Sequence, residues 1–160
     1  MAFVMILHLS PTYESMLAQI LGRATSMPVL QVKGRMKIEP NHVYVIPPNA
    51  EMTVKNGTLA LQLRNKNEIP HLPIDAFFRS LAQHQQKRAI SVVLTGHGSD
   101  GAEGTKAIKN QGGITFAQIP RSALYDSMPA HTIAITEIDF VLTVREIALE
   151  ISKISRRIVG

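Results

Sequence analysis

The sequence predicts an α/β fold with a doubly wound, mainly parallel sheet that carries helices on both faces. Two observations lead to this prediction: short apolar runs alternate regularly with amphipathic stretches, and a glycine cluster after residues 90–95 opens directly into one of those stretches. A length of 160 residues with 45% hydrophobic content suits one globular domain with a sizeable core. The expectation is a single domain over residues 1–160.

The chain opens with a β–α unit. Residues 2–9 are almost entirely apolar and predict a buried strand. Ser10 and Pro11 then supply a helix N-cap and first helical residue for a helix over 12–25, and 27–33 is a further short apolar run.

A β-hairpin is expected as an insertion in this pattern. The apolar run 42–48 is followed by 51–64, whose centre is Asn56-Gly57. Asn-Gly favours the type I′ turn that joins two antiparallel strands.

The second half of the chain alternates again. The expected elements are a helix at 74–87, strands at 90–95 and 113–118 around a helix at 102–111, a strand at 138–142 and a helix at 144–159. Asp75 is expected to cap the helix that carries Phe77 and Phe78. His71 and Pro73 are expected to shape the preceding loop, and 125–129 to form a loop that either lines a groove or simply packs.

Composition restricts the chemistry. With no cysteine, thiolate nucleophiles, disulfides and cysteine-ligated metals are excluded. The net charge of +5 is read as a solvated basic face and not a nucleic-acid site, because no aromatic residues interleave with the cations. The apolar start lacks a basic flank and a cleavage site, so a cytoplasmic chain with no signal peptide and no membrane insertion is expected.

The glycine turn allows two interpretations. Gly96, Gly98 and Gly101 match the GxGxxG pattern of dinucleotide sites, in the required position between a strand and a helix. The next strand ends in Gln118 and not in the acidic residue expected roughly 20 residues on. A nucleotide-binding domain therefore remains one alternative.

Two polar residues follow buried strands. His8 ends the first strand, and Asp100 lies between a strand and the helix after it. Because ligands of α/β sheets bind at the carboxyl ends of the strands, both are expected in one crevice, as a base and its orienting carboxylate. Alone, a histidine in the position of His8 is more often a structural residue hydrogen-bonded to the backbone. The spacing of the six histidines does not suggest a metal site.

Several segments resemble the chemotaxis protein-glutamate methylesterases, above all the variant fused to a receptor methyltransferase. They are ILHLSP (6–11), HVYVIPPN (42–49), HLPIDAFFRSLA (71–82) and VLTGHGSDGAEGTKAIKNQGGITFAQIPRSALYDSMP (93–129), in family order. The resemblance implies an α/β esterase domain that hydrolyses glutamyl methyl esters on chemoreceptor helices, releases methanol, deamidates certain glutamines and needs no cofactor or metal. It makes His8 the general base and Asp100 its partner. It also suggests a regulatory receiver or methyltransferase domain as a partner.

The sequence departs from the family pattern at its start. Family members begin with a strand and a glycine-rich turn that carries the serine nucleophile, and no such segment precedes Met1 in this sequence. The expectation is a domain incomplete at its N-terminus and impaired as an esterase, or a noncatalytic remnant that binds receptors or signalling proteins. The hydroxyls nearest the expected site are those of Ser10, Thr12, Thr95 and Ser99.

A second departure is His97, where the family usually has an uncharged residue. His97, Gly98 and Met128 are expected at the oxyanion region or the wall of the substrate crevice, and the His97 imidazole either competes with His8 for Asp100 or is exposed without a role. The family strand missing from the sequence should lie between the strand ending at His8 and the strand ending at Thr95. Open strand edges there favour a homodimer.

Overall fold

The computed structural model describes residues 1–8, 16–64, 67 and 71–159 of the chain. The strands are β1 (Phe3–Met5), β2 (Val29–Gln31), β3 (Arg35–Lys37), β4 (Val43–Val45), β5 (Ala50–Lys55), β6 (Thr58–Leu63), β7 (Ile90–Val93), β8 (Ile114–Gln118) and β9 (Phe140–Leu142). The helices are α1 (Leu17–Ala24), α2 (Pro73–Gln85), α3 (Ala102–Asn110), α4 (Ser127–Ile135) and α5 (Val144–Val159), with short 3-10 helices η1 (Gln86–Arg88) and η2 (Pro120–Ser122).

The predicted α/β class is confirmed, and the parallel strands are divided between two sheets. One has the order β1-β4-β2 and the other β7-β8-β9, each three-stranded and parallel. β1 and β7 are edge strands, and no described strand pairs with their outer edges. The single sheet expected from the sequence is thus interrupted between β1 and β7. This is the position at which the family resemblance predicts a further strand.

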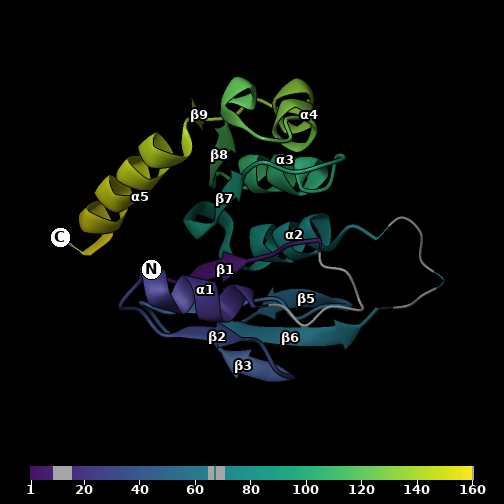
Figure 1. Cartoon of the computed structure of the whole chain (residues 1–160), viewed down its shortest axis with the longest axis vertical. Coiled ribbons are helices and arrows are strands. Elements are labelled where there is room, and N and C mark those ends of the chain that lie inside the picture. Colours follow the sequence, from purple (N-terminus) through teal and green to yellow (C-terminus); the bar gives the residue numbers. More distant parts are fainter. Residues whose placement is uncertain (9–15, 65–66, 68–70, 160) are drawn as a thin grey trace.

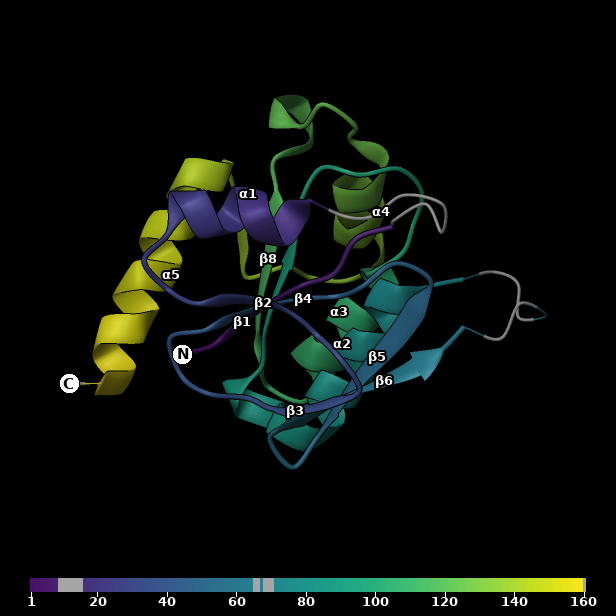
Figure 2. The same ribbon diagram turned by 60° about the horizontal axis from the view of Figure 1, so that its bottom comes forward.

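Helices cover both faces of the sheet that contains β8. Figures 1 and 2 show α5 on one side of β8 and α4 on the other, next to α3. Contacts of α5 with β8 and β9, and of α3 and α4 with β7 and β8, agree with this arrangement. This is the doubly wound arrangement that the alternating sequence pattern predicts.

The predicted hairpin is present as β5 and β6. Asn56 and Gly57 have φ angles of 50° and 72°, as a type I′ turn requires. β3, which the sequence did not predict, adds a third antiparallel strand beside β6. β3 has only three residues and alternates charged, apolar, charged, so only Met36 turns partly inward.

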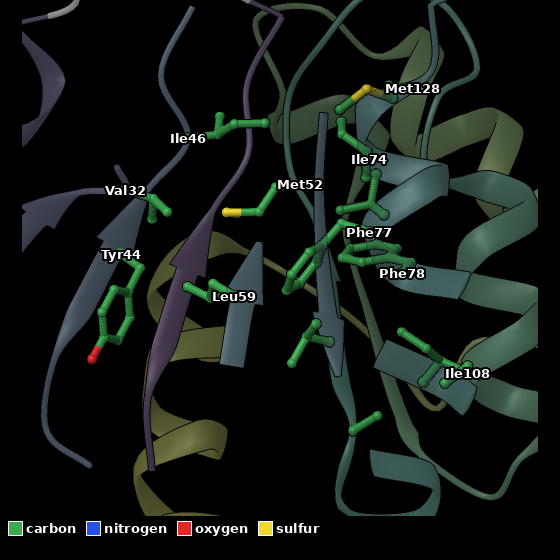
Figure 3. Packing of buried hydrophobic residues seen from close by; sticks show 14 residues of the cluster. Val32, Tyr44, Ile46, Met52, Leu59, Ile74, Phe77, Phe78, Ile108 and Met128 are labelled. Carbon is green, nitrogen blue, oxygen red and sulfur yellow. The ribbon is translucent and has the colours of Figure 1, made fainter. Parts of the chain in front are cut away.

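The hydrophobic core joins this antiparallel sheet to β4 and α2. Figure 3 shows Phe77 and Phe78 of α2 between Leu59 on the strand side and Ile108 of α3. Tyr44 of β4 is also buried there, and its hydroxyl group accepts from the Glu39 N–H and donates to the Lys37 carbonyl. A buried tyrosine hydroxyl needs such partners to offset its lost hydration.

Two local predictions are wrong. Asp75 does not cap α2, because its carboxylate accepts the N–H groups of Gly101 and Gly104 instead, and the residue before α2, Leu72, supplies no side-chain cap of its own. The segment expected as a loop at 125–129 contains the start of α4. This helix is apolar around most of its circumference and therefore shows little amphipathic period, and its proline lies in the first turn, where helices tolerate it.

The predicted N-cap at Ser10 and the start of its helix lie outside the described residues. The described part of that helix is α1, which begins after Met16. Among the residues that the structure describes, no helix combines the length and apolar character needed to cross a bilayer.

Candidate active site

The structure brings His8 and Asp100 together beyond the carboxyl ends of β1 and β7, the edge strands of the two parallel sheets. His8 lies just after β1, and Asp100 lies in the turn between β7 and α3. The His8 Nε2–H donates to Asp100 Oδ2 across 2.8 Å. The side chain of His8 is 45% exposed, whereas that of Asp100 is 2% exposed. A solvent-accessible imidazole is therefore attached to a buried carboxylate.

Asp100 is held in place by the start of α2. Its Oδ2 also accepts the Ile74 N–H at 2.9 Å, and its Oδ1 accepts the Asp75 N–H at 2.8 Å. Both donors belong to the first turn of α2, where N–H groups lack partners within the helix and the helix dipole favours negative charge. The carboxylate thus caps α2 while it orients His8.

This carboxylate raises the pKa of His8 above its ordinary value of 6.5. The hydrogen bond from His8 to Asp100 is the largest cause, partial burial opposes it, and the charge of Asp100 adds to the rise. The Arg64 cation lowers the pKa of His8 by a smaller amount. The pairing favours the imidazolium form that a general base reaches after it accepts a proton.

A second histidine lies beside the first. The rings of His71 and His8 are edge-to-face with centroids 6.3 Å apart, and His71 Nδ1 lies 3.6 Å from Glu51 Oε1. Burial and the Arg64 cation lower the pKa of His71, although Glu51 opposes this. The sequence predicts His71 in the loop before α2 but gives no sign of Glu51 and Arg64, because both belong to the hairpin segment 51–64 and no spacing links them to His8.

The glycine turn is attached to the start of α4. The Thr95 hydroxyl accepts the Tyr125 N–H at 2.8 Å and donates to the Tyr125 carbonyl at 3.1 Å. The backbones of the turn and of α4 are also bonded to each other, because the Met128 N–H donates to the Gly96 carbonyl at 3.1 Å. The turn and α4 therefore form one wall beside Asp100.

All three glycines of the GxGxxG pattern donate their N–H groups to protein acceptors. The donors Gly96, Gly98 and Gly101 bond, in that order, to the Tyr125 carbonyl at 2.9 Å, the Ser127 hydroxyl at 3.0 Å and the Asp75 carboxylate at 3.1 Å. A phosphate-binding loop needs such N–H groups to point at the ligand. This arrangement disfavours the nucleotide-binding alternative.

The three residues expected at the crevice wall have different surroundings. The His97 ring packs against the Tyr125 ring with centroids 3.9 Å apart, and it makes no hydrogen bond to Asp100. The N–H groups of Gly98 and Met128 are both engaged, as described above. In this conformation, neither of these two N–H groups is free to stabilise an oxyanion.

The remaining expectations concern hydroxyls and metals. Thr95 is engaged with Tyr125, and Ser10 and Thr12 lie outside the described residues. Across residues 1–8, 16–64, 67 and 71–159, no group of three or more His, Asp or Glu side chains is arranged to hold a metal ion.

Known proteins share both the sequence and the fold of this chain. The family model described as CheB methylesterase matches residues 1–151. A crystal structure of the Thermotoga maritima CheB methylesterase catalytic domain superposes with a TM-score of 0.83 at 24% identity, covering 94% of this chain and 82% of that chain. At this identity, the structural match concerns the fold.

Relatives carry related names. A putative protein-glutamate methylesterase/protein-glutamine glutaminase of Leptospira interrogans is 30% identical over 91% of this chain and 76% of its own length. A protein-glutamate methylesterase/protein-glutamine glutaminase of Myxococcus xanthus is 30% identical over 94% of this chain. An uncharacterized 104.1 kDa protein of Rhodobacter capsulatus is 41% identical over 82% of this chain.

The chain spans 45% of the Myxococcus protein and 14% of the Rhodobacter protein. The match to the family model nevertheless covers most of the chain, and its residues include both His8 and Asp100. The chain belongs to the CheB methylesterase family.

Proposed function

We propose that this chain is a protein-glutamate methylesterase-type domain in which His8 is the general base and Asp100 its orienting partner. The observation that carries the proposal is the 2.8 Å hydrogen bond from a half-exposed imidazole to a buried carboxylate. The names of the relatives support glutamyl methyl esters as substrates and glutamine side chains as a second substrate class.

The geometry assigns different roles to the two nitrogens of His8. Nε2 donates to Asp100, and Nδ1 makes no hydrogen bond to another described residue. Nδ1 therefore accepts the proton of the attacking hydroxyl group while that oxygen bonds to the ester carbonyl carbon. As the bond from carbon to the methoxy oxygen breaks, the same proton passes to that oxygen and methanol leaves. Asp100 stabilises the intervening imidazolium.

The attacking group sets the rate that this chain reaches. Among the described residues, no hydroxyl group hydrogen-bonds to His8, so the reaction proposed for these residues is slow hydrolysis with water as the nucleophile. Triad members act as a unit, and loss of the nucleophile removes most of their combined effect.

His97, Gly98 and Met128 complete the proposal as the wall of the substrate crevice. They lie on the turn before Asp100 and on the first turn of α4, which are joined by hydrogen bonds. The substrate would be an exposed side chain on a methylated chemoreceptor helix. Cytoplasmic location is proposed on the same basis, because the modified receptor segment and its enzyme must share a compartment.

The test is methanol release from a methylated receptor fragment. The parent chain is compared with His8→Ala, with His84→Ala as a control at the far end of α2, and with a chain extended by a strand and serine turn of the family type. We expect slow release by the parent, none by His8→Ala, and a strong increase in the extended chain. Silence in the parent and the extended chain alike contradicts the proposal and favours the receptor-binding remnant.

A further inference from the structure

Two buried aspartates cap each other's helices. Asp100 precedes α3 but accepts the Ile74 and Asp75 N–H groups at the start of α2. Asp75 lies in α2, and its Oδ1 accepts the Gly101 N–H at 3.1 Å and the Gly104 N–H at 2.7 Å at the start of α3. The N-terminus of each helix is therefore satisfied by a carboxylate from the other segment.

Glycines allow this close approach. A Cβ atom on Gly104 would lie 2.5 Å from the Phe78 Cβ and 3.2 Å from Asp75 Oδ1. Gly101 has a φ of 94°, a conformation that side chains rarely adopt, and a Cβ there would lie 2.9 Å from Ile74. The spacing of these glycines thus serves the contact between α2 and α3.

Asp75 is as deeply buried as its counterpart, with 3% exposure. Burial raises the pKa of Asp75, the Gly104 N–H opposes that rise, and the charge of Asp100 adds to it. A buried carboxylate near a second one has a cost in free energy, which the donated N–H groups partly offset.

We propose that Asp75 is a positioning residue for His8 that acts through Asp100. Asp75 holds Gly101, the residue directly after Asp100, and its own N–H bonds to Asp100 Oδ1. The first link holds the backbone directly after Asp100, and the second holds Oδ1 of its carboxylate. Together they keep Oδ2 within hydrogen-bonding distance of His8 Nε2. The role of His8 as a base rests on the function proposed above, whereas the positioning itself is a property of the folded chain.

The test measures the pKa of His8 in the full chain by NMR titration of its ring resonances. His8 faces Asp100, His71 and Arg64, so its pKa responds to any displacement of Asp100. Asp75→Ala removes the acceptor, while Asp75→Asn retains an Oδ1 acceptor for both N–H groups and replaces the charged carboxylate by a neutral amide. We expect the pKa of His8 to fall in Asp75→Ala and to stay near the parent value in Asp75→Asn.

Ile108→Ala is the matched control, because Ile108 is fully buried at the opposite end of α3. It should lower the unfolding midpoint in denaturant without changing the pKa of His8. If Asp75→Ala does not fold, Asp75→Ser retains a hydroxyl on a shorter side chain, and a smaller fall in the pKa of His8 is expected.

An unchanged pKa of His8 in the folded Asp75→Ala or Asp75→Ser protein overturns the proposal. An equal fall in Asp75→Ala and Asp75→Asn also overturns it, since charge and not position would then be the cause. Neither measurement uses methanol release. An inactive parent chain would therefore contradict the proposed function and leave this inference to be decided by the titration.

Discussion

The glycine turn is held differently on its two sides. Before Asp100, Thr95 and Gly98 bond to Tyr125 and Ser127 through hydroxyl and backbone groups in an exposed region. After Asp100, buried carboxylates accept the N–H groups that begin two helices. Charge-assisted hydrogen bonds in a buried site are stronger than neutral ones near solvent. The carboxylate side therefore fixes the proposed base, and the hydroxyl side leaves the crevice wall adjustable.

The largest effect is expected on the carboxylate side. Asp100→Ala leaves the Ile74 and Asp75 N–H groups without their acceptor and removes the partner of His8. We expect the free energy of unfolding to fall by about 3 kcal/mol, the scale for loss of a buried charged acceptor. Urea unfolding followed by circular dichroism checks this, and a loss below about 1 kcal/mol would contradict a dominant carboxylate side.

Gly104→Ala tests the contact between α2 and α3. The new methyl group meets the Phe78 Cβ at 2.5 Å, so the helices must separate, and we expect a loss of about 2 kcal/mol, typical of an overpacked site. Gly22→Ala in α1 is the control. Nothing lies within 4 Å of its Cβ, so the better helix propensity of alanine should raise stability by up to about 1 kcal/mol. A Gly104→Ala protein as stable as the parent would show that the helix contact is loose.

Thr95→Val tests the hydroxyl side. The variant keeps the shape of the side chain and removes the group that bonds twice to the Tyr125 backbone. Because the site is exposed and water can replace the hydroxyl, we expect a loss of about 1 kcal/mol or less. Thermal unfolding measures this loss, and an effect as large as that of Asp100→Ala would remove the difference between the two sides.

The smallest expected effect is on the pH dependence of stability. The raised pKa of His8 stabilises the fold below 6.5, and this contribution is lost as pH rises through the folded-state pKa. The lowered pKa of His71 acts in the opposite direction, because protonation of this side chain is less favourable in the folded protein than in the unfolded one. The resulting loss of stability grows as pH falls below 6.5. In denaturant unfolding at several pH values, His8→Ala should weaken the decline above 6.5, and His71→Ala should weaken the decline below it. Identical profiles for both variants would contradict the opposite pKa shifts.

Much of the site was predictable because it follows from strand direction. His8 follows β1 and Asp100 lies in the turn after β7, and the carboxyl ends of strands in parallel sheets are where α/β proteins gather such polar residues. The turn at Asn56-Gly57 was predictable from local backbone preference alone.

The unpredicted features depend on tertiary contacts. Asp75 occupies the first turn of its own helix, where sequence rules favour a local cap, yet its carboxylate bonds to a helix that begins more than 25 residues later. Glu51 reaches His71 from the hairpin. α4 has too little amphipathic period to be identified, because its exposed face carries Ala130 and Ala134 and its buried face carries Thr132.

The exchange of caps between α2 and α3 also has a consequence for local unfolding. Neither helix can lose its first turn without removing the carboxylate that completes the other, so the two starts open in one cooperative event. The amide hydrogens of Ile74, Asp75, Gly101 and Gly104 should then exchange with deuterium at a common opening free energy. The proposed base and its partner would be dismantled together, as one unit, and not residue by residue.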